Sequence, residues 1–78
     1  MMRNRKLRFK SFYLPSGPLL ETDKAIEVAI GYRNTSKIRA KIWIPKSQIN
    51  IRNRGRLIEI PEWLVAVKVP SDQTILEI

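Results

Sequence analysis

The 78-residue chain contains no cysteine and no histidine. The first absence excludes disulfide bonds, thiolate catalysis and cysteine-based zinc sites. The second removes the commonest general base and metal ligand. The seven acids lie mostly at the edges of expected strands and turns, and the three glycines form no phosphate-cradling motif. We therefore expect no enzyme, and we predict no catalytic residue, no metal site and no cofactor.

Long apolar runs are also missing. No run approaches the ~18–20 residues that a membrane-spanning helix needs, and the basic N-terminus lacks the apolar core of a signal peptide. We therefore predict a cytoplasmic protein without membrane association. A chain of 78 residues buries only roughly 60–65% of its unfolded surface. The sequence thus predicts one small core and leaves homodimerisation open as a further source of stability.

Positive charge is abundant and unevenly distributed. The formal net charge is +8, and residues 33–56 contain eight of the 15 lysines and arginines but no acid. Residues 1–20 contain five more, again without an acid, whereas residues 21–32 and 57–78 are net acidic. Such segregation indicates a one-sided positive surface that suits a polyanionic partner. The alternative is a solvated basic face without a partner.

Residues 37–44 alternate between two residue types. The apolar set consists of Ile38, Ala40, Ile42 and Ile44. The other set consists of three cations and an indole, namely Lys37, Arg39, Lys41 and Trp43. A period of two predicts a half-buried β-strand with the charged set facing outward. Trp43 has two readings, because an exposed indole can stack on a base, whereas cover from Pro45 and a later helix makes it a core residue.

The other elements follow from turn residues and short apolar runs. We predict strands at 7–14, 25–32, 49–51, 57–60 and 74–78, a hairpin loop at 33–36, a turn at 53–56 and a helical turn at 61–67. A helix starting from Thr22 or Asp23 is the weaker alternative for 25–32. Trp63 is predicted to be a core residue. Phe12 and Tyr13 face opposite ways in the first strand, so one of them is expected to be exposed.

These elements predict a mainly β fold. Four or five short antiparallel strands would curl or close into a small barrel of the oligonucleotide-binding or SH3-like type, with one short helical turn. An α+β sheet with one covering helix is the alternative. We predict a mobile basic arm over residues 1–6 and a single small β-rich domain over residues 7–78.

Two segments carry a resemblance. Residues 43–49 read Trp-Ile-Pro-Lys-Ser-Gln-Ile, and residues 58–64 read Ile-Glu-Ile-Pro-Glu-Trp-Leu. Together they resemble a pattern in small, largely uncharacterised proteins of phages and mobile elements, over roughly residues 25–64. The resemblance implies a biological setting more than an activity. The basic N-terminal 20 residues and the apolar segment after Leu64 depart from that pattern.

The sequence predicts sequence-tolerant binding of nucleic acid, either DNA or RNA. Lysines and arginines would neutralise phosphates, and Trp43, Phe12 or Tyr13 would stack on bases. The candidate binding residues are Arg8, Lys10, Lys37, Arg39, Lys41, Trp43, Lys46, Arg52, Arg54 and Arg56. The alternative is an accessory protein of a phage or mobile element, including one with an anti-defence role. Its basic face would then bind an acidic protein surface, on a host factor or a nucleic-acid-handling machine.

Overall fold

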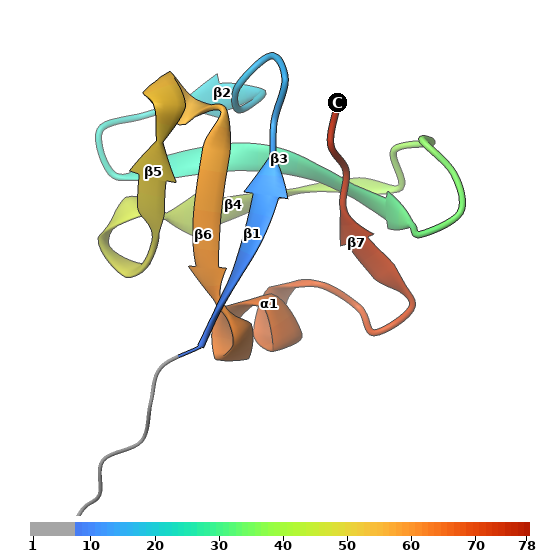
Figure 1. The fold of residues 1–78 in the computed structure, drawn as a ribbon. Coiled ribbons are helices and arrows are strands. Elements are labelled where there is room, and N and C mark those ends of the chain that lie inside the picture. The colour runs from blue at the N-terminus through green and yellow to red at the C-terminus, as the bar shows by residue number, and fades with distance from the viewer. Residues whose placement is uncertain (1–7) are drawn as a thin grey trace, which may run out of the picture.

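The computed structural model describes residues 8–78. Its strands form two antiparallel sheets (Figure 1). The first sheet has the order β1-β6-β5, from strands β1 (Phe9–Tyr13), β6 (Leu57–Pro61) and β5 (Asn50–Arg52). The second has the order β2-β3-β4, from strands β2 (Leu20–Glu21), β3 (Ala25–Tyr32) and β4 (Ala40–Pro45), and β7 (Gln73–Ile75) also pairs with β3. The helical elements are the 3₁₀ turns η1 (Lys46–Gln48) and η2 (Asn53–Gly55) and the helix α1 (Glu62–Lys68).

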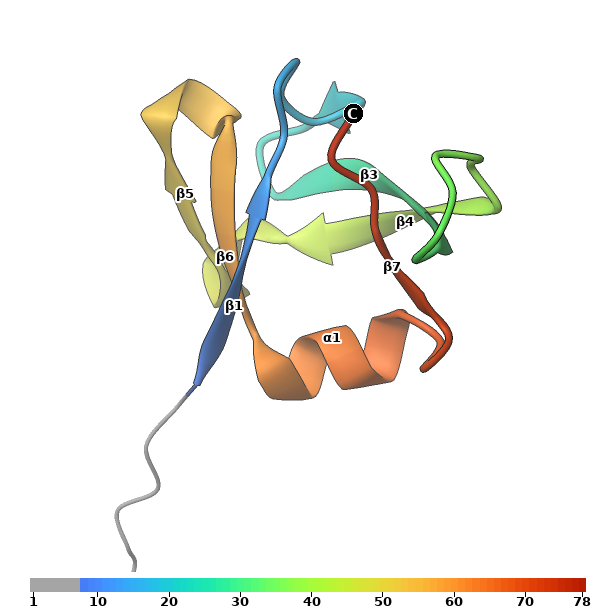
Figure 2. The same cartoon turned by 45° about the vertical axis from the view of Figure 1, so that its right-hand side comes forward.

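The two sheets lie face to face with crossing strand directions, and α1 lies across the lower end of the molecule (Figures 1 and 2). The core fills the space between them. The first sheet contributes Phe12, Ile58 and Ile60, and the second contributes Ile26, Val28, Ile30, Ile44 and Ile75. Helix α1 adds Leu64, and connecting segments add Leu14 and Val69. The outer faces of the sheets consequently point in opposite directions, which matters for the placement of the basic residues.

The structure confirms a mainly β, antiparallel fold with one short helix close to the expected position. It does not show a closed barrel, because the described strands divide into two separate sheets. The described residues form seven strands, against the expected four or five. The two-residue strand β2 matches none of the predicted ranges, whereas β5 and β7, with three residues each, overlap the strands predicted at 49–51 and 74–78. The predicted arm at residues 1–6 and the start of the first strand at Leu7 lie outside the described residues.

The predicted strand at 37–44 begins only at Ala40, so its first three residues were assigned wrongly. The reason is a close approach of the preceding segment to β3. A Cβ atom at Gly31 would collide with the carbonyl oxygen of Lys37, so the chain crosses β3 where that strand has no side chain. Ile38 and Ala40 are therefore exposed and do not join the inward face. The connection between β3 and β4 spans residues 33–39 instead of 33–36.

The prediction that Trp63 is a core residue is wrong, since the side chain is 49% exposed. Helix α1 turns Leu64 into the core. Trp63 and Val67 lie four residues apart, which places them on the same side of a helix, and that side faces solvent, with Val67 74% exposed. Within residues 8–78, α1 has seven residues, and no helix is long and apolar enough to cross a membrane.

Candidate nucleic-acid interface

Strand β4 presents a cation and an aromatic ring on the outer face of its sheet. Ile44 is buried and Ile42 partly buried, so the alternating Lys41 and Trp43 point outward, where both are exposed. Adjacent outward side chains on a strand are about 7 Å apart. Arg39 precedes the strand by one residue, and its backbone N–H donates to the carbonyl of Ile30 at 2.8 Å. We call Arg39, Lys41 and Trp43 the β4 surface.

Arg39 is held by an aromatic neighbour. Its guanidinium carbon lies 5.1 Å from the centroid of the Tyr32 ring, within the range of a cation–π interaction. Neither Arg39 nor Lys41 makes an ion pair with another residue in the described part of the chain. Both charges are therefore free to meet an anion.

Trp43 is 40% exposed, which excludes a fully core role. Its cross-strand neighbour on β3 is Glu27, and the next residue in that row is Leu20 on β2. Since β4 forms an edge of its sheet, one flank of the indole is open. Part of the ring is therefore accessible to a planar ligand, while Glu27 places one negative charge beside it.

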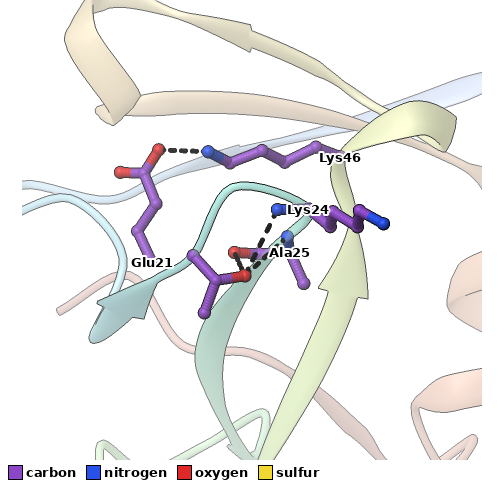
Figure 3. A network of polar contacts seen from close by, with 5 residues as sticks. Glu21, Lys24, Ala25 and Lys46 are labelled. Atoms are coloured by element: carbon purple, nitrogen blue, oxygen red, sulfur yellow. Dashed lines mark hydrogen bonds and ion pairs between the residues drawn. The ribbon is translucent and has the colours of Figure 1, made fainter.

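Lys46 is not a free cation. Its Nζ atom lies 2.5 Å from Oε2 of Glu21, an ion pair that joins η1 to the end of β2 (Figure 3). The same corner is ordered by Thr22, whose Oγ1 atom accepts hydrogen bonds from the backbone N–H groups of Lys24 and Ala25. Lys46 thus connects two elements at a sheet corner, and the exposed pair contributes at most about 1 kcal/mol.

The first sheet brings a second group of predicted residues together. Tyr13 is 50% exposed, and it lines a surface hollow of about 390 Å³ with Asn53, Arg54 and Arg56. The backbone N–H of Leu14 donates to the carbonyl of Arg56 at 2.7 Å, which fixes the turn against the end of β1. We call these four residues the Tyr13 hollow.

The turn that forms this hollow has an unusual backbone. Asn53 has a φ of 53° and Arg54 a φ of 58°, so two non-glycine residues in succession adopt the left-handed conformation. Gly55 follows with a φ of 88°, as expected for the glycine of the predicted turn. Such conformations cost of order 1 kcal/mol or more for residues with a side chain. Arg54 therefore occupies a position at which glycine would be less strained.

Arg52 lies on the same outer face but is engaged. Its Nε atom donates to Oε1 of Glu59 at 3.0 Å, and Asn50 donates its Nδ2 proton to the same oxygen at 3.3 Å. These contacts balance the one acidic group of the sheet's outer face. Arg52 therefore neutralises Glu59 and is less available to a phosphate than Arg54 or Arg56.

The other predicted residues lie apart from both groups. Arg8 precedes β1, and its carbonyl accepts a hydrogen bond from the backbone N–H of Glu62. Lys10 lines a separate hollow with Glu62 beside α1. Lys37 is exposed in the connection between β3 and β4. Phe12 is buried at 8% exposure, so it is excluded as a stacking residue.

The structure thus divides the predicted basic face into two separated surfaces. The β4 surface belongs to the second sheet, and the Tyr13 hollow belongs to the first. Sequence reasoning missed the Arg39–Tyr32 contact and the convergence of Tyr13 with Arg54 and Arg56. The run Asn53-Arg54-Gly55 did contain a signal for the strained turn, because asparagine and glycine tolerate the left-handed region best.

Among residues 8–78, no group of three or more acidic, histidine or cysteine side chains is placed to hold a metal ion. No protein-family model, no curated protein and no solved structure matches the chain.

Proposed function

We propose that the protein binds nucleic acid without strong sequence preference, using the β4 surface as one contact region. The observation that carries this proposal is the unpaired state of Arg39 and Lys41 beside a partly exposed Trp43. Cations neutralise phosphates and release counterions, whatever the sequence. An indole stacks on any base, because every base has an aromatic face.

An ordinary structural explanation covers only part of this surface. A lysine on an edge strand discourages pairing with another sheet, and Lys41 on β4 fits that role. The same explanation does not account for Arg39, which lies outside the strand over Tyr32. It also does not account for the exposed indole two residues from Lys41, since an exposed apolar ring on an edge strand promotes association with another chain. Contact with a polyanion accounts for all three residues.

Sequence tolerance follows from the kind of groups present. Base identity is read mainly by side chains that form bidentate hydrogen bonds with base edges, whereas phosphate contacts fix position without reading sequence. Lys41 offers a point charge and Trp43 a stacking plane. Discrimination between oligonucleotides of equal length should therefore be small.

The proposal is tested by titrating a fluorescently labelled oligonucleotide of mixed sequence with the full chain, at several salt concentrations from low to physiological. Each phosphate contact contributes about −0.7 to −0.9 to the slope of log K against log salt. We expect a clear negative slope and similar affinities for unrelated sequences. Absence of binding at low salt, or an affinity that does not respond to salt, would contradict the proposal.

A second candidate function is that of an accessory protein of a phage or mobile element, including an anti-defence role, that binds a protein partner. The exposed pair of Trp63 and Val67 on α1 favours it, because large aromatic residues often anchor protein interfaces. Nuclease treatment during affinity capture from host lysate separates the two candidates. Partners that disappear after nuclease support nucleic-acid binding, whereas one stoichiometric protein that persists supports the accessory role.

A further inference from the structure

We infer that the Tyr13 hollow is a contact site for single-stranded nucleic acid, in which one unpaired base stacks on the Tyr13 ring while Arg54 and Arg56 hold the adjoining phosphates. This inference rests on the proposed nucleic-acid binding. It adds that the ligand is single-stranded and that the protein has a second contact region. It depends on three features of the hollow: its chemistry, its backbone and its position.

The chemistry of the hollow is complementary to a nucleotide. One half-exposed aromatic ring and two arginines line the same depression, and neither arginine makes an ion pair within residues 8–78. Guanidinium groups bind phosphate oxygens in a bidentate manner. The volume of about 390 Å³ falls at the small end of the roughly 300–1,000 Å³ typical of ligand sites. This volume is large enough to accommodate one nucleotide.

The backbone conformation at Arg54 indicates that this side chain does not serve the stability of the fold. Arg54 adopts a φ of 58° immediately before Gly55, and Asn53 has a φ of 53°. A strained charged residue at the tip of a turn is a common mark of a functional position. The turn is nevertheless well anchored, because the N–H of Arg56 donates to the carbonyl of Asn53 and its own carbonyl accepts from Leu14. Arg54 is therefore presented from a fixed turn, which limits the entropy lost on binding.

The position of Tyr13 favours an unpaired base. The ring belongs to the last residue of β1 on the outer face of the first sheet, across from Leu57. Bases of a duplex are stacked on one another and do not expose their faces, so stacking on a protein ring requires a single strand. Glu59 lies one step further along the same face, and Arg52 and Asn50 satisfy its carboxylate. The negative charge of Glu59 is thereby balanced. Glu77 places a second carboxylate near Tyr13, because its Oε2 atom accepts a hydrogen bond from the backbone N–H of Tyr13 at 3.2 Å, and the two positive charges of Arg54 and Arg56 outnumber it.

Other features of the molecule support no comparable inference. The hollow beside α1 places Lys10 next to Glu62, and no aromatic ring lines it. The exposed apolar side of α1 offers no charge that would define its occupant. The Tyr13 hollow instead combines a ring with two cations that make no ion pair within residues 8–78, all in one depression.

The test uses the full chain and two labelled ligands of equal length and charge: an oligothymidine, and a phosphodiester chain of the same length that carries no bases. Stacking on one ring corresponds to a preference for the base-containing ligand of about 5- to 150-fold. Tyr13→Leu should lower this preference by the share that its ring supplies, about 5- to 150-fold, while leaving the affinity for the abasic chain unchanged. Tyr13→Phe retains the ring and should keep the preference. A duplex of the same sequence should bind no better to the wild type than to Tyr13→Leu.

The matched control is Trp43→Leu, which removes the aromatic ring of the β4 surface. If this variant loses the base preference and Tyr13→Leu keeps it, the stacking site lies on β4 and the inference is overturned. Equal binding of both ligands by the wild type also overturns it, while the proposed function stands. If neither ligand binds at low salt, the proposed function itself fails, and the inference fails with it.

Discussion

The guanidinium carbon of Arg39 lies 5.1 Å from the centroid of the Tyr32 ring, so the last residue of the β3–β4 connection contacts the last residue of β3 at the end of the sheet. A cation–π contact at an exposed site contributes about 0.5–1 kcal/mol. Tyr32→Leu should therefore raise the dissociation constant for an oligonucleotide by no more than about fivefold. Tyr32→Phe keeps the ring face and should bind like the wild type. A Tyr32→Leu variant that binds more tightly would show that the ring sequesters Arg39 instead of presenting it.

Replacing Arg39 and Lys41 together should weaken binding and flatten its salt dependence. If each residue contacts one phosphate, the slope of log K against log salt should decrease in magnitude by about 1.4–1.8. The matched control is Lys24→Ala/Lys68→Ala, which removes the same charge from positions outside both surfaces. Equal losses in the two double variants would mean that net charge, and not its arrangement, determines the affinity.

Arg54→Gly should stabilise the protein while weakening its binding. The left-handed backbone at Arg54 costs about 1 kcal/mol relative to glycine, so thermal melting should occur at a higher temperature. Loss of the guanidinium should reduce the salt slope by about 0.7 for a single strand. Asn53→Gly relieves strain in the same turn and keeps both arginines, so it should not weaken binding. Equal binding by Arg54→Gly and the wild type would remove Arg54 from the interface.

Two neighbouring residues of α1 should differ sharply in their contribution to stability. Leu64 is buried, and its replacement by alanine should cost about 2–5 kcal/mol of unfolding free energy. Trp63 is half exposed, so Trp63→Ala should cost about 1 kcal/mol or less and leave oligonucleotide binding intact. Chemical denaturation measures both values. A loss for Trp63→Ala as large as that for Leu64→Ala would restore its predicted place in the core.

Gly31→Ala should destabilise the protein through the chain that crosses β3. The added methyl group would displace the carbonyl of Lys37, and overpacking of this kind typically costs about 1–3 kcal/mol. Gly17→Ala is a useful comparison, because its Cβ would have a nearest neighbour at 3.9 Å and would suffer only from the φ of 76°. Denaturation curves should therefore show the larger loss for Gly31→Ala.

Local patterns predicted much of the fold. The apolar alternation of Ile26, Val28 and Ile30 identified β3 and its inward face, and Pro61 placed the start of α1 within one residue. The strand β7 overlaps the strand predicted at 74–78, whereas β2 was not predicted and exists only through its pairing with Ile26 and Glu27 of β3. A two-residue strand has no period to detect, so its existence follows from the tertiary arrangement and not from its own sequence.

The candidate site was harder to predict, for two physical reasons. The alternating pattern predicted that Lys37 and Arg39 belong to a strand. The backbone of Lys37 instead packs against Gly31 of β3, a contact that no local sequence pattern reveals. The sequence also treated the basic residues of 37–46 and 52–56 as one face, whereas the crossing of two sheets separates them. An ion pair to Glu21, 25 residues away along the chain, then engages Lys46, and an ion pair to Glu59 on the neighbouring strand engages Arg52.

Amide chemical-shift mapping by NMR tests the central claim most directly. The full chain is titrated with unlabelled oligothymidine at low salt, and each assigned backbone amide is followed. We expect the largest shifts at Arg39, Lys41 and Trp43 on one sheet and at Tyr13, Arg54 and Arg56 on the other, and we expect these shifts to diminish as the salt concentration is raised. Shifts confined to α1 around Trp63, or no shifts at low salt, would contradict the claim.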